Sequence, residues 1–212
     1  MEDPRLTRLK RLQALAATGL HFTQDAYDRE RYAEIGAIAE ALLADLLSMP
    51  IPDLHGLPRP EEGYATPRVE VRGAVIRDGR ILLVKEATDG LWSLPGGYCD
   101  VGLSPAENIE KEIREEAGLT VRARHLYLLR HKAKGPFPPD PRDFYKLYFL
   151  CEEAGAAEPS PAHETTEAAF FAPEALPPLS AVRVHASDIE MAFRHAADPA
   201  RATDFDETAP IR

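Results

Sequence analysis

Residues 94–119 read LPGGYCDVGLSPAENIEKEIREEAGL, and this stretch predicts a tight glycine turn followed by a capped helix. Ser104 stands at the N-cap position and Glu107 follows three residues later, which is the spacing of a capping box. Pro105 occupies the first helical position, where the N–H that proline lacks would have no helical partner. The sequence therefore predicts a helix that begins at Pro105 and ends one residue before Gly118, a typical residue after the last helical turn.

Three carboxylates share one face of this predicted helix, because Glu112, Glu115 and Glu116 are spaced three and four residues apart. Such a face can be an ordinary solvated surface, on which like charges repel one another slightly. A divalent cation such as Mg²⁺ or Mn²⁺ would reverse that repulsion, since both ions prefer oxygen ligands. The preceding Gly96 and Gly97 have no Cβ atoms, so their backbone can approach the same point closely. The neighbouring apolar stripe predicts the face that packs on a sheet: Ala106, Ile109, Ile113 and Ala117.

The spacing of residues 97–119 resembles the Nudix box, whose usual form is a glycine, five residues, a glutamate, seven residues and then R-E-U-x-E-E-x-G-U, with U aliphatic. The matching positions are Gly97, Glu112, Ile113, Glu115, Glu116, Gly118 and Leu119. The resemblance implies a Nudix hydrolase that uses Mg²⁺ or Mn²⁺ to hydrolyse a diphosphate bond. It implies that Glu112, Glu115 and Glu116 are the catalytic metal ligands, with the Gly97 carbonyl as a weaker ligand.

Two positions depart from the box. Leu103 stands where the first glutamate is expected, and Lys111 stands where the arginine is expected. In the family that arginine orients a neighbouring metal-binding glutamate, and lysine keeps its charge but lacks its planar, bidentate fork. We expect these departures to affect efficiency more than reaction class. The alternative is a non-catalytic Nudix-fold nucleotide sensor with a weakened active site.

The composition indicates a globular protein without a membrane segment. Of the 212 residues, 44% are hydrophobic, and the formal net charge of −10 disfavours the basic surface that nucleic-acid binding requires. The charged N-terminus does not resemble a signal peptide, and no apolar run approaches the roughly 20 residues of a membrane helix. Cys99 and Cys151 do not make a disulfide framework. We therefore expect a cytoplasmic protein that binds neither nucleic acid nor membrane.

Two N-terminal segments predict a helical hairpin over residues 1–49. Apolar residues recur at helical spacing over 4–20 and again over 25–49, where Asp25 is a plausible N-cap. Two such helices cannot bury both apolar faces alone. They can dock on the catalytic domain or pair with a second subunit, and we favour a homodimer. The Nudix subgroup that the chain most resembles carries a similar hairpin, which supports that choice.

Prolines and glycines mark a linker over residues 50–67, which precedes a Nudix domain over 68–197 and a flexible tail over 198–212. Within the domain, the apolar runs VEVRGAVI and ILLVKEA flank Asp78 and Gly79, which predicts a β-hairpin.

Later segments complete the predicted domain. Ser187 and Glu190 predict the capping box of a closing helix that ends near Ala197. Further strands are predicted over 121–132, 144–153 and 167–176. This order of elements fits the α/β (α+β) class and, through the resemblance, a Nudix α/β/α sandwich with a mixed sheet.

Residues outside the box are further candidates for the site. Many members of the family draw another glutamate from a later loop, as a base or an extra ligand, and Glu164 and Glu167 are the candidates here. A solvated loop carboxylate is an equally common role for either one. Arg72, Lys85 and Arg130 could bind substrate phosphates, although surface charge is the more common role of a single basic residue.

The substrate is a choice between related nucleotides. The subgroup with an N-terminal hairpin resembles hydrolases of X-linked nucleoside diphosphates, including CDP-choline and ADP-ribose pyrophosphatases, which release a nucleoside monophosphate. Trp92 or Tyr98 could stack on the base, and the Gly96 backbone is a further candidate substrate contact. A choline group would require an aromatic cage, for which the candidates are Trp92, Tyr98, Phe137, Tyr145 and Tyr148. Aromatic residues on strands are more often part of the core, so both substrates remain open.

Overall fold

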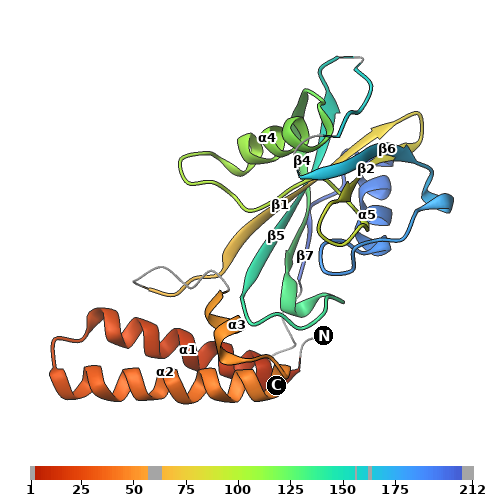
Figure 1. Cartoon of the computed structure of the whole chain (residues 1–212). Coiled ribbons are helices and arrows are strands. Elements are labelled where there is room, and N and C mark those ends of the chain that lie inside the picture. The colour runs from red at the N-terminus through yellow and green to blue at the C-terminus, as the bar shows by residue number, and fades with distance from the viewer. Residues whose placement is uncertain (1–2, 57–63, 156, 162–163, 207–212) are drawn as a thin grey trace, which may run out of the picture. The chain divides into compact units, whose positions relative to one another are not determined.

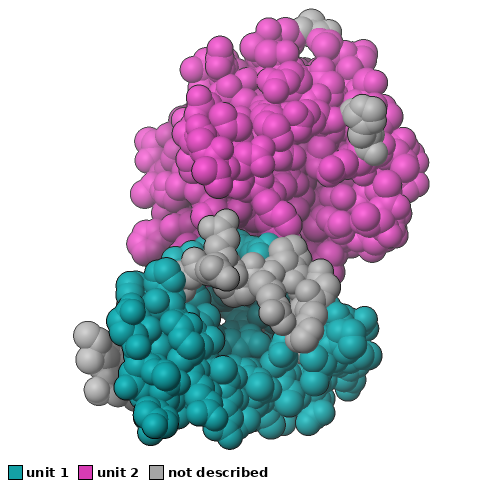
Figure 2. Space-filling view, turned by 60° about the vertical axis from the view of Figure 1, so that its left-hand side comes forward, with its two compact units in different colours: residues 1–68, 133–144 teal, residues 69–132, 145–212 magenta. Residues whose placement is uncertain are grey.

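The structure is a computed structural model that describes residues 3–56, 64–155, 157–161 and 164–206. The chain forms two compact units, which Figure 2 shows in different colours. One unit comprises residues 1–68 and 133–144, and the other comprises residues 69–132 and 145–212.

The N-terminal unit is built on two long helices, α1 (Pro4–Phe22) and α2 (Ala26–Leu47) (Figure 1). The predicted cap of α2 is confirmed, because the Asp25 carboxylate accepts hydrogen bonds from the backbone N–H groups of Tyr27 and Asp28 at 2.8 and 2.9 Å. The two helices pack on each other as an antiparallel hairpin and bury the following side chains: Leu6, Ala16, Ala39, Leu43 and Ala44.

A short helix, α3 (Ile51–Gly56), occupies part of the predicted linker of residues 50–67. Pro52 lies in the first turn of α3, where the missing N–H has no helical partner, so the proline does not prevent the helix. Proline and glycine content alone predicted an irregular segment. Residues 57–63 of the linker lie outside the described part of the chain.

Residues 133–144 belong to the N-terminal unit, whereas the sequence predicted one continuous domain over 68–197. The Nζ of Lys10 on α1 donates hydrogen bonds to the carbonyl oxygens of Asp140 at 3.5 Å and Arg142 at 3.4 Å. It also forms an ion pair with Asp143 at 3.1 Å. These partners are more than 100 positions apart along the chain, so no local sequence pattern indicates them.

The second unit is organised around a seven-stranded mixed sheet (Figure 1). Its strands lie in the order β3-β2-β1-β5-β4-β7, and β6 pairs with β2. β7 runs parallel to β4, whereas β2 pairs antiparallel with β1, β3 and β6. The strand bounds are β1 (Arg68–Arg77), β2 (Arg80–Glu86), β3 (Trp92–Ser93), β4 (Val121–His131), β5 (Phe144–Glu153), β6 (Thr165–Phe171) and β7 (Asp204–Phe205).

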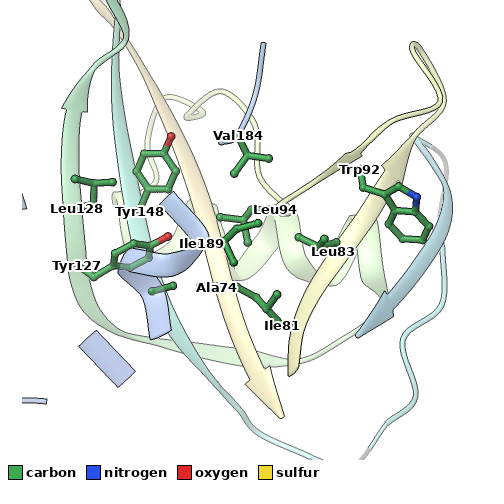
Figure 3. Packing of buried hydrophobic residues seen from close by; sticks show 11 residues of the cluster. Ala74, Ile81, Leu83, Trp92, Leu94, Tyr127, Leu128, Tyr148, Val184 and Ile189 are labelled. Carbon is green, nitrogen blue, oxygen red and sulfur yellow. The ribbon is translucent and has the colours of Figure 1, made fainter. Parts of the chain in front are cut away.

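Two helices, α4 (Pro105–Ala117) and α5 (Ala186–Ala197), cover opposite faces of this sheet. Side chains of β2 alternate between the two faces, as the pleat of a strand requires. Leu83 belongs to the hydrophobic cluster around Ile189 of α5, part of which Figure 3 shows. Leu82 belongs to the cluster around Ile113 of α4. The predicted α/β class, with a mixed sheet between helices, is confirmed.

The predicted hairpin between β1 and β2 is confirmed. Arg77 pairs with Arg80 across the turn. Asp78 and Gly79 between them have φ values of 49° and 72°, which are typical of the two central residues of a type I′ turn. Two 3₁₀ helices, η1 (Lys132–Lys134) and η2 (Pro173–Ala175), complete the secondary structure of the described residues.

The closing helix α5 begins earlier than predicted. Its N-cap is His185 rather than Ser187, and the Asp188 carboxylate accepts a hydrogen bond from the His185 backbone N–H at 3.0 Å. The predicted pair of Ser187 and Glu190 was wrong, because His185 and Asp188 form the capping box two residues earlier. Among the described residues, no helix combines the length and the apolarity that crossing a bilayer requires.

The segment after α5 is ordered up to residue 206, although the sequence predicted a flexible tail over 198–212. β7 pairs with β4, and the Thr203 Oγ1 donates a hydrogen bond to the Leu126 carbonyl at 2.6 Å. The Asp204 carboxylate lies 2.7 Å from Nε2 of the buried His195. These contacts fix the segment on the sheet. Residues 207–212 lie outside the described residues.

Candidate active site

Helix α4 holds the predicted carboxylates and has the predicted bounds. Both hydrogen bonds of the capping box are present, between the Ser104 hydroxyl and the Glu107 N–H at 3.2 Å and between the Glu107 carboxylate and the Ser104 N–H at 2.8 Å. The helix packs closely on β1 at Gly73, where a Cβ atom would lie 2.6 Å from Cδ1 of Ile113. The apolar face of the helix is thereby anchored, and the adjacent acidic face meets the Gly96–Gly97 turn.

The Gly96–Gly97 turn is pressed against the backbone of β1. The Val71 N–H donates to the Gly97 carbonyl, and the Gly73 N–H donates to the Pro95 carbonyl, both at 2.9 Å. Gly96 has a φ of 142°, and a Cβ atom there would lie 2.0 Å from the Val71 carbonyl oxygen. Only glycine permits this approach, which aims the Gly96 N–H at the Glu116 carboxylate at 2.8 Å.

The three glutamates of the box do not share one environment. Glu116 is 5% exposed and is held by the Gly96 N–H. The Glu112 side chain is 14% exposed, and its Oε2 lies 3.1 Å from the point where a Gly97 Cβ would stand. The Glu115 side chain is 51% exposed and forms an ion pair with Lys111 at 2.9 Å. Two of the predicted ligands therefore line the turn, and the third is directed to the helix surface.

The protonation of the inner carboxylates reflects their burial. Burial raises the pKa of Glu116 to about 8, although the charge of Arg72 and the Gly96 hydrogen bond both act to lower it. Burial also raises the pKa of Glu112, on which the charges of Glu115 and Glu164 act in the same direction. A bound cation would offset the free-energy cost of ionising these buried carboxylates, because it would stabilise the ionised forms.

The chemistry of these positions decides whether a divalent cation fits them. The described residues do not gather three or more His, Cys, Asp or Glu side chains in a ready metal site. The donor chemistry nevertheless fits, since Glu112 and Glu116 offer carboxylate oxygens beside a turn without Cβ atoms. The Gly97 carbonyl already accepts the Val71 N–H, which leaves one lone pair. Glu115 could join only by leaving Lys111.

The two candidate glutamates beyond the box lie in different settings. Glu167 on β6 is opposite Lys85 on β2, and their side chains form an exposed ion pair at 2.8 Å. Glu164 precedes β6, and the adjacent Thr165 donates a hydrogen bond to the Glu116 carbonyl at 2.7 Å. The charge of Glu164 also raises the pKa of Glu112. The structure therefore brings Glu164, rather than Glu167, to the carboxylates of α4.

Three other predicted substrate contacts are engaged by protein groups. Arg72 is only 4% exposed and binds Glu70. Trp92 belongs to the core cluster of Figure 3, with its ring packed edge-on against another aromatic ring. Arg130 forms an ion pair at 3.3 Å with the buried Asp188 of α5. Tyr98, directly after the glycine turn, is the exposed member of the predicted set, at 48%.

Sequence reasoning missed Asn108 and Glu86, which support the site. Asn108 is buried in α4, and its Oδ1 accepts the Asp100 N–H at 2.8 Å, which fastens the loop before the helix. Glu86 at the end of β2 is buried and forms an ion pair with Arg183 at 3.1 Å. Asn108 could have been found, because it is a polar residue on the inner face of an amphipathic helix. No local signal identifies Glu86.

Known proteins match the chain over both units. The family model of the NUDIX domain matches residues 67–191, and the model of the UDP-X-like, N-terminal oligomerisation domain matches residues 3–57. The Bacillus subtilis protein YjhB, to which ADP-ribose pyrophosphatase activity is provisionally ascribed, is 43% identical over 202 residues. That alignment covers 95% of this chain and 96% of YjhB.

Two solved structures are also similar. The crystal structure of an ADP-ribose pyrophosphatase from Streptococcus suis has 38% sequence identity and a TM-score of 0.61, and the match covers 66% of this chain and 100% of that one. The crystal structure of a UDP-X diphosphatase has 31% identity and a TM-score of 0.61, and this match covers 95% of this chain and 97% of that one.

Proposed function

The chain belongs to the Nudix hydrolase family and is a diphosphatase of nucleoside diphosphate derivatives, and we propose that its substrate is ADP-ribose or a compound closely similar to it. The observation that carries the enzymatic proposal is the pairing of a buried Glu116 with the Gly96 N–H, beside Glu112 on the same helix. The names of the Bacillus and Streptococcus relatives support the ADP-ribose assignment.

CDP-choline has less support as the substrate. A cage for its quaternary ammonium needs exposed aromatic faces, but Trp92, Phe137 and Tyr148 are each buried in the protein. Tyr98 and Tyr145 keep substantial exposure. None of the relatives described above is named for CDP-choline, so we propose the ADP-ribose class ahead of it.

The cofactor that we propose is Mg²⁺ or Mn²⁺, held by Glu112 and Glu116, with Glu115 as a third ligand once it leaves Lys111. Such an ion supplies Lewis-acid stabilisation of diphosphate oxygens and activation of water. The Gly96 N–H orients the Glu116 carboxylate, and Glu164 is the favoured later carboxylate for accepting a proton. Tyr98 is the favoured side chain for stacking on the base, since its ring is exposed beside the turn.

The proposal is tested by a substrate screen with the purified chain of 212 residues. ADP-ribose, UDP-sugars, CDP-choline and NADH are incubated with and without Mg²⁺ or Mn²⁺, and the products are separated by chromatography. We expect release of AMP from ADP-ribose only with metal. Preferred turnover of another X-linked nucleoside diphosphate would overturn the substrate assignment, and tight nucleotide binding without turnover of any compound would favour a sensor.

Lys111→Arg should leave kcat/KM unchanged or raise it by no more than about fivefold. This limit corresponds to about 1 kcal/mol, which is what a partly exposed ion pair contributes. The Lys111 Nζ lies 3.1 Å from Asp100, 2.9 Å from Glu115 and 3.9 Å from Glu112. A guanidinium can bind two carboxylates at once, which a point charge does less well. Arg114→Lys on the exposed side of the same helix is the matched control. A tenfold loss in the Lys111 variant alone would show that the site depends on the lysine itself.

We also propose that the α1–α2 hairpin joins two copies of the chain. The family model that covers residues 3–57 is described as an oligomerisation domain. Large apolar side chains stay exposed on the hairpin, namely Leu15, Phe22, Tyr27, Ile38 and Leu42. Exposed large apolar side chains are found at protein–protein interfaces, so they support this proposal.

Ile38→Asp should convert the dimer to a species of 23.4 kDa in sedimentation at micromolar concentration, because it buries a charge in the proposed interface. Ala33→Asp is the matched control, since it adds the same charge at an exposed position on another side of α2. We expect the control to sediment at twice the mass of one chain. A wild-type protein that sediments only as the 23.4 kDa species would contradict the proposed dimer.

A further inference from the structure

The buried Arg72 connects β1 to the turn that holds Glu116. Its Nε and Nη2 lie 2.7 and 2.6 Å from the same Glu70 oxygen. Its Nη1 donates to the Leu94 carbonyl at 2.9 Å and to the Ser93 hydroxyl at 3.1 Å. The guanidinium therefore spans from the strand to the residues that enter the glycine turn.

The turn is held on β1 by backbone bonds and by this side-chain connection. Leu94 lies two residues before Gly96, whose N–H holds Glu116 at 2.8 Å. Backbone hydrogen bonds from Val71 and Gly73 fix the turn at Gly97 and Pro95. Arg72 lies between these two strand residues and adds the side-chain contact at Leu94. A planar guanidinium can make these bonds together because its N–H groups diverge in one fixed plane.

Arg72 also acts on the site through its charge. The Glu86 carboxylate lies 3.9 Å from Nη1, and Glu116 contributes to the electrostatic environment of the guanidinium. In a buried setting with little solvent, such a charge favours an ionised carboxylate more strongly than it would at the surface.

We propose that Arg72 is a positioning residue of the glutamate site, which holds residues 94–97 in place and, through the Gly96 N–H, orients Glu116. The inference rests on the proposed function, because the oriented carboxylate is a proposed metal ligand. It assigns Arg72 a role different from direct contact with a substrate phosphate, which its burial disfavours.

Lys146 provides a matched control for Arg72. It is 0% exposed and binds the same Glu70 oxygen at 2.7 Å. It approaches from β5, on the opposite side of β1 from β2 and β3. Arg72→Met and Lys146→Met each remove one buried cation and leave Glu70 with the other, so their general effects on stability should be similar.

The test compares Arg72→Met, Arg72→Lys and Lys146→Met in the chain of 212 residues. The first readout is the affinity for Mn²⁺ alone, measured by electron paramagnetic resonance of the free ion. The second is hydrogen exchange of the backbone around 94–97 without metal. The third is the separation of kcat from KM. We expect Arg72→Met to weaken Mn²⁺ binding about 10- to 100-fold, as the loss of a group that orients a metal ligand does.

Arg72→Met should also speed exchange around 94–97 and lower kcat more than it raises KM. Arg72→Lys should fall between it and the wild type, while Lys146→Met stays within about twofold of the wild-type affinity. Equal effects of Arg72→Met and Lys146→Met, or a wild-type response of Arg72→Met, would overturn the inference. If Arg72→Met does not fold, the comparison of Arg72→Lys with Lys146→Met decides in the same way. A wild-type chain without metal-dependent turnover would instead contradict the proposed function, and the exchange result would still test Arg72.

Discussion

Glu116→Gln should reduce metal-dependent hydrolysis by at least about 100-fold while the fold stays intact. Loss of a group that only orients a metal ligand lowers metal affinity or activity about 10- to 100-fold. Glu116 is itself a proposed ligand, so its loss should have a larger effect. The amide oxygen can still accept the Gly96 N–H that now binds Oε2 at 2.8 Å. The substitution therefore removes the group that a bound cation would stabilise in its ionised form, and it leaves the position of the turn unchanged.

The measurement is initial-rate hydrolysis of the preferred substrate over a Mn²⁺ titration, with unfolding by urea to verify the fold. Glu110→Gln is the matched control on the same helix. Its carboxylate accepts the Ala123 N–H at 3.0 Å and forms an ion pair with Arg122, away from the glycine turn. We expect near wild-type turnover for the control. Full metal-dependent activity in a folded Glu116 variant would show that the metal is held elsewhere.

The second large effect concerns stability, and we expect Glu70→Gln to lower the free energy of unfolding by about 3 kcal/mol at neutral pH. Removing one member of a buried ion pair costs about 3–5 kcal/mol, because it leaves a buried charge uncompensated. Glu70 is 5% exposed and neutralises both Arg72 and Lys146. Burial already lowers the pKa of Lys146 to about 8, so loss of its proton can relieve part of the cost.

The difference between wild type and variant should depend on pH in a defined direction. Burial alone would raise the pKa of Glu70, but Arg72 and Lys146 outweigh it and lower the pKa from 4.5 to about 2. The folded state therefore binds the proton less readily than the unfolded state does. The stabilisation is fully present above pH 4.5 and is lost as the pH falls toward 2.

Urea unfolding at several pH values between about 3.5 and 6 measures this difference. Glu167→Gln is the matched control, because its ion pair with Lys85 is exposed and should contribute less than about 1 kcal/mol. A Glu70 variant whose deficit stays constant or grows on acidification would contradict the expected pKa direction.

Local sequence signals predicted the elements that carry the chemistry. The bounds of α4 were predicted because Ser104, Pro105 and Glu107 form a short-range capping pattern, and both of its hydrogen bonds are present. The β1–β2 hairpin was predicted because Asp78 and Gly79 favour positive φ. In both cases the stabilising contacts lie within a few residues of one another.

Features that depend on distant partners were not predicted. The ion pair of Glu86 with Arg183 joins the end of β2 to a segment almost 100 residues later, and neither position is part of a pattern. The β7 segment has only two residues, so it is too short to show strand periodicity. The sequence assigned the three glutamates to one face of α4, but Glu116 is buried against the glycine turn and Glu115 is exposed. The position of that turn depends on contacts with β1, which the sequence of the helix does not contain.

The attachment of the glycine turn to β1 has a consequence for how new specificities can arise. Residues 94–97 share their hydrogen bonds with the centre of the sheet, so they cannot move without disturbing the core. The loop that follows is different, since Val101 within it is 98% exposed. Directed evolution toward other nucleotides should therefore accumulate tolerated changes in residues 101–103, while the 94–97 segment stays nearly immutable.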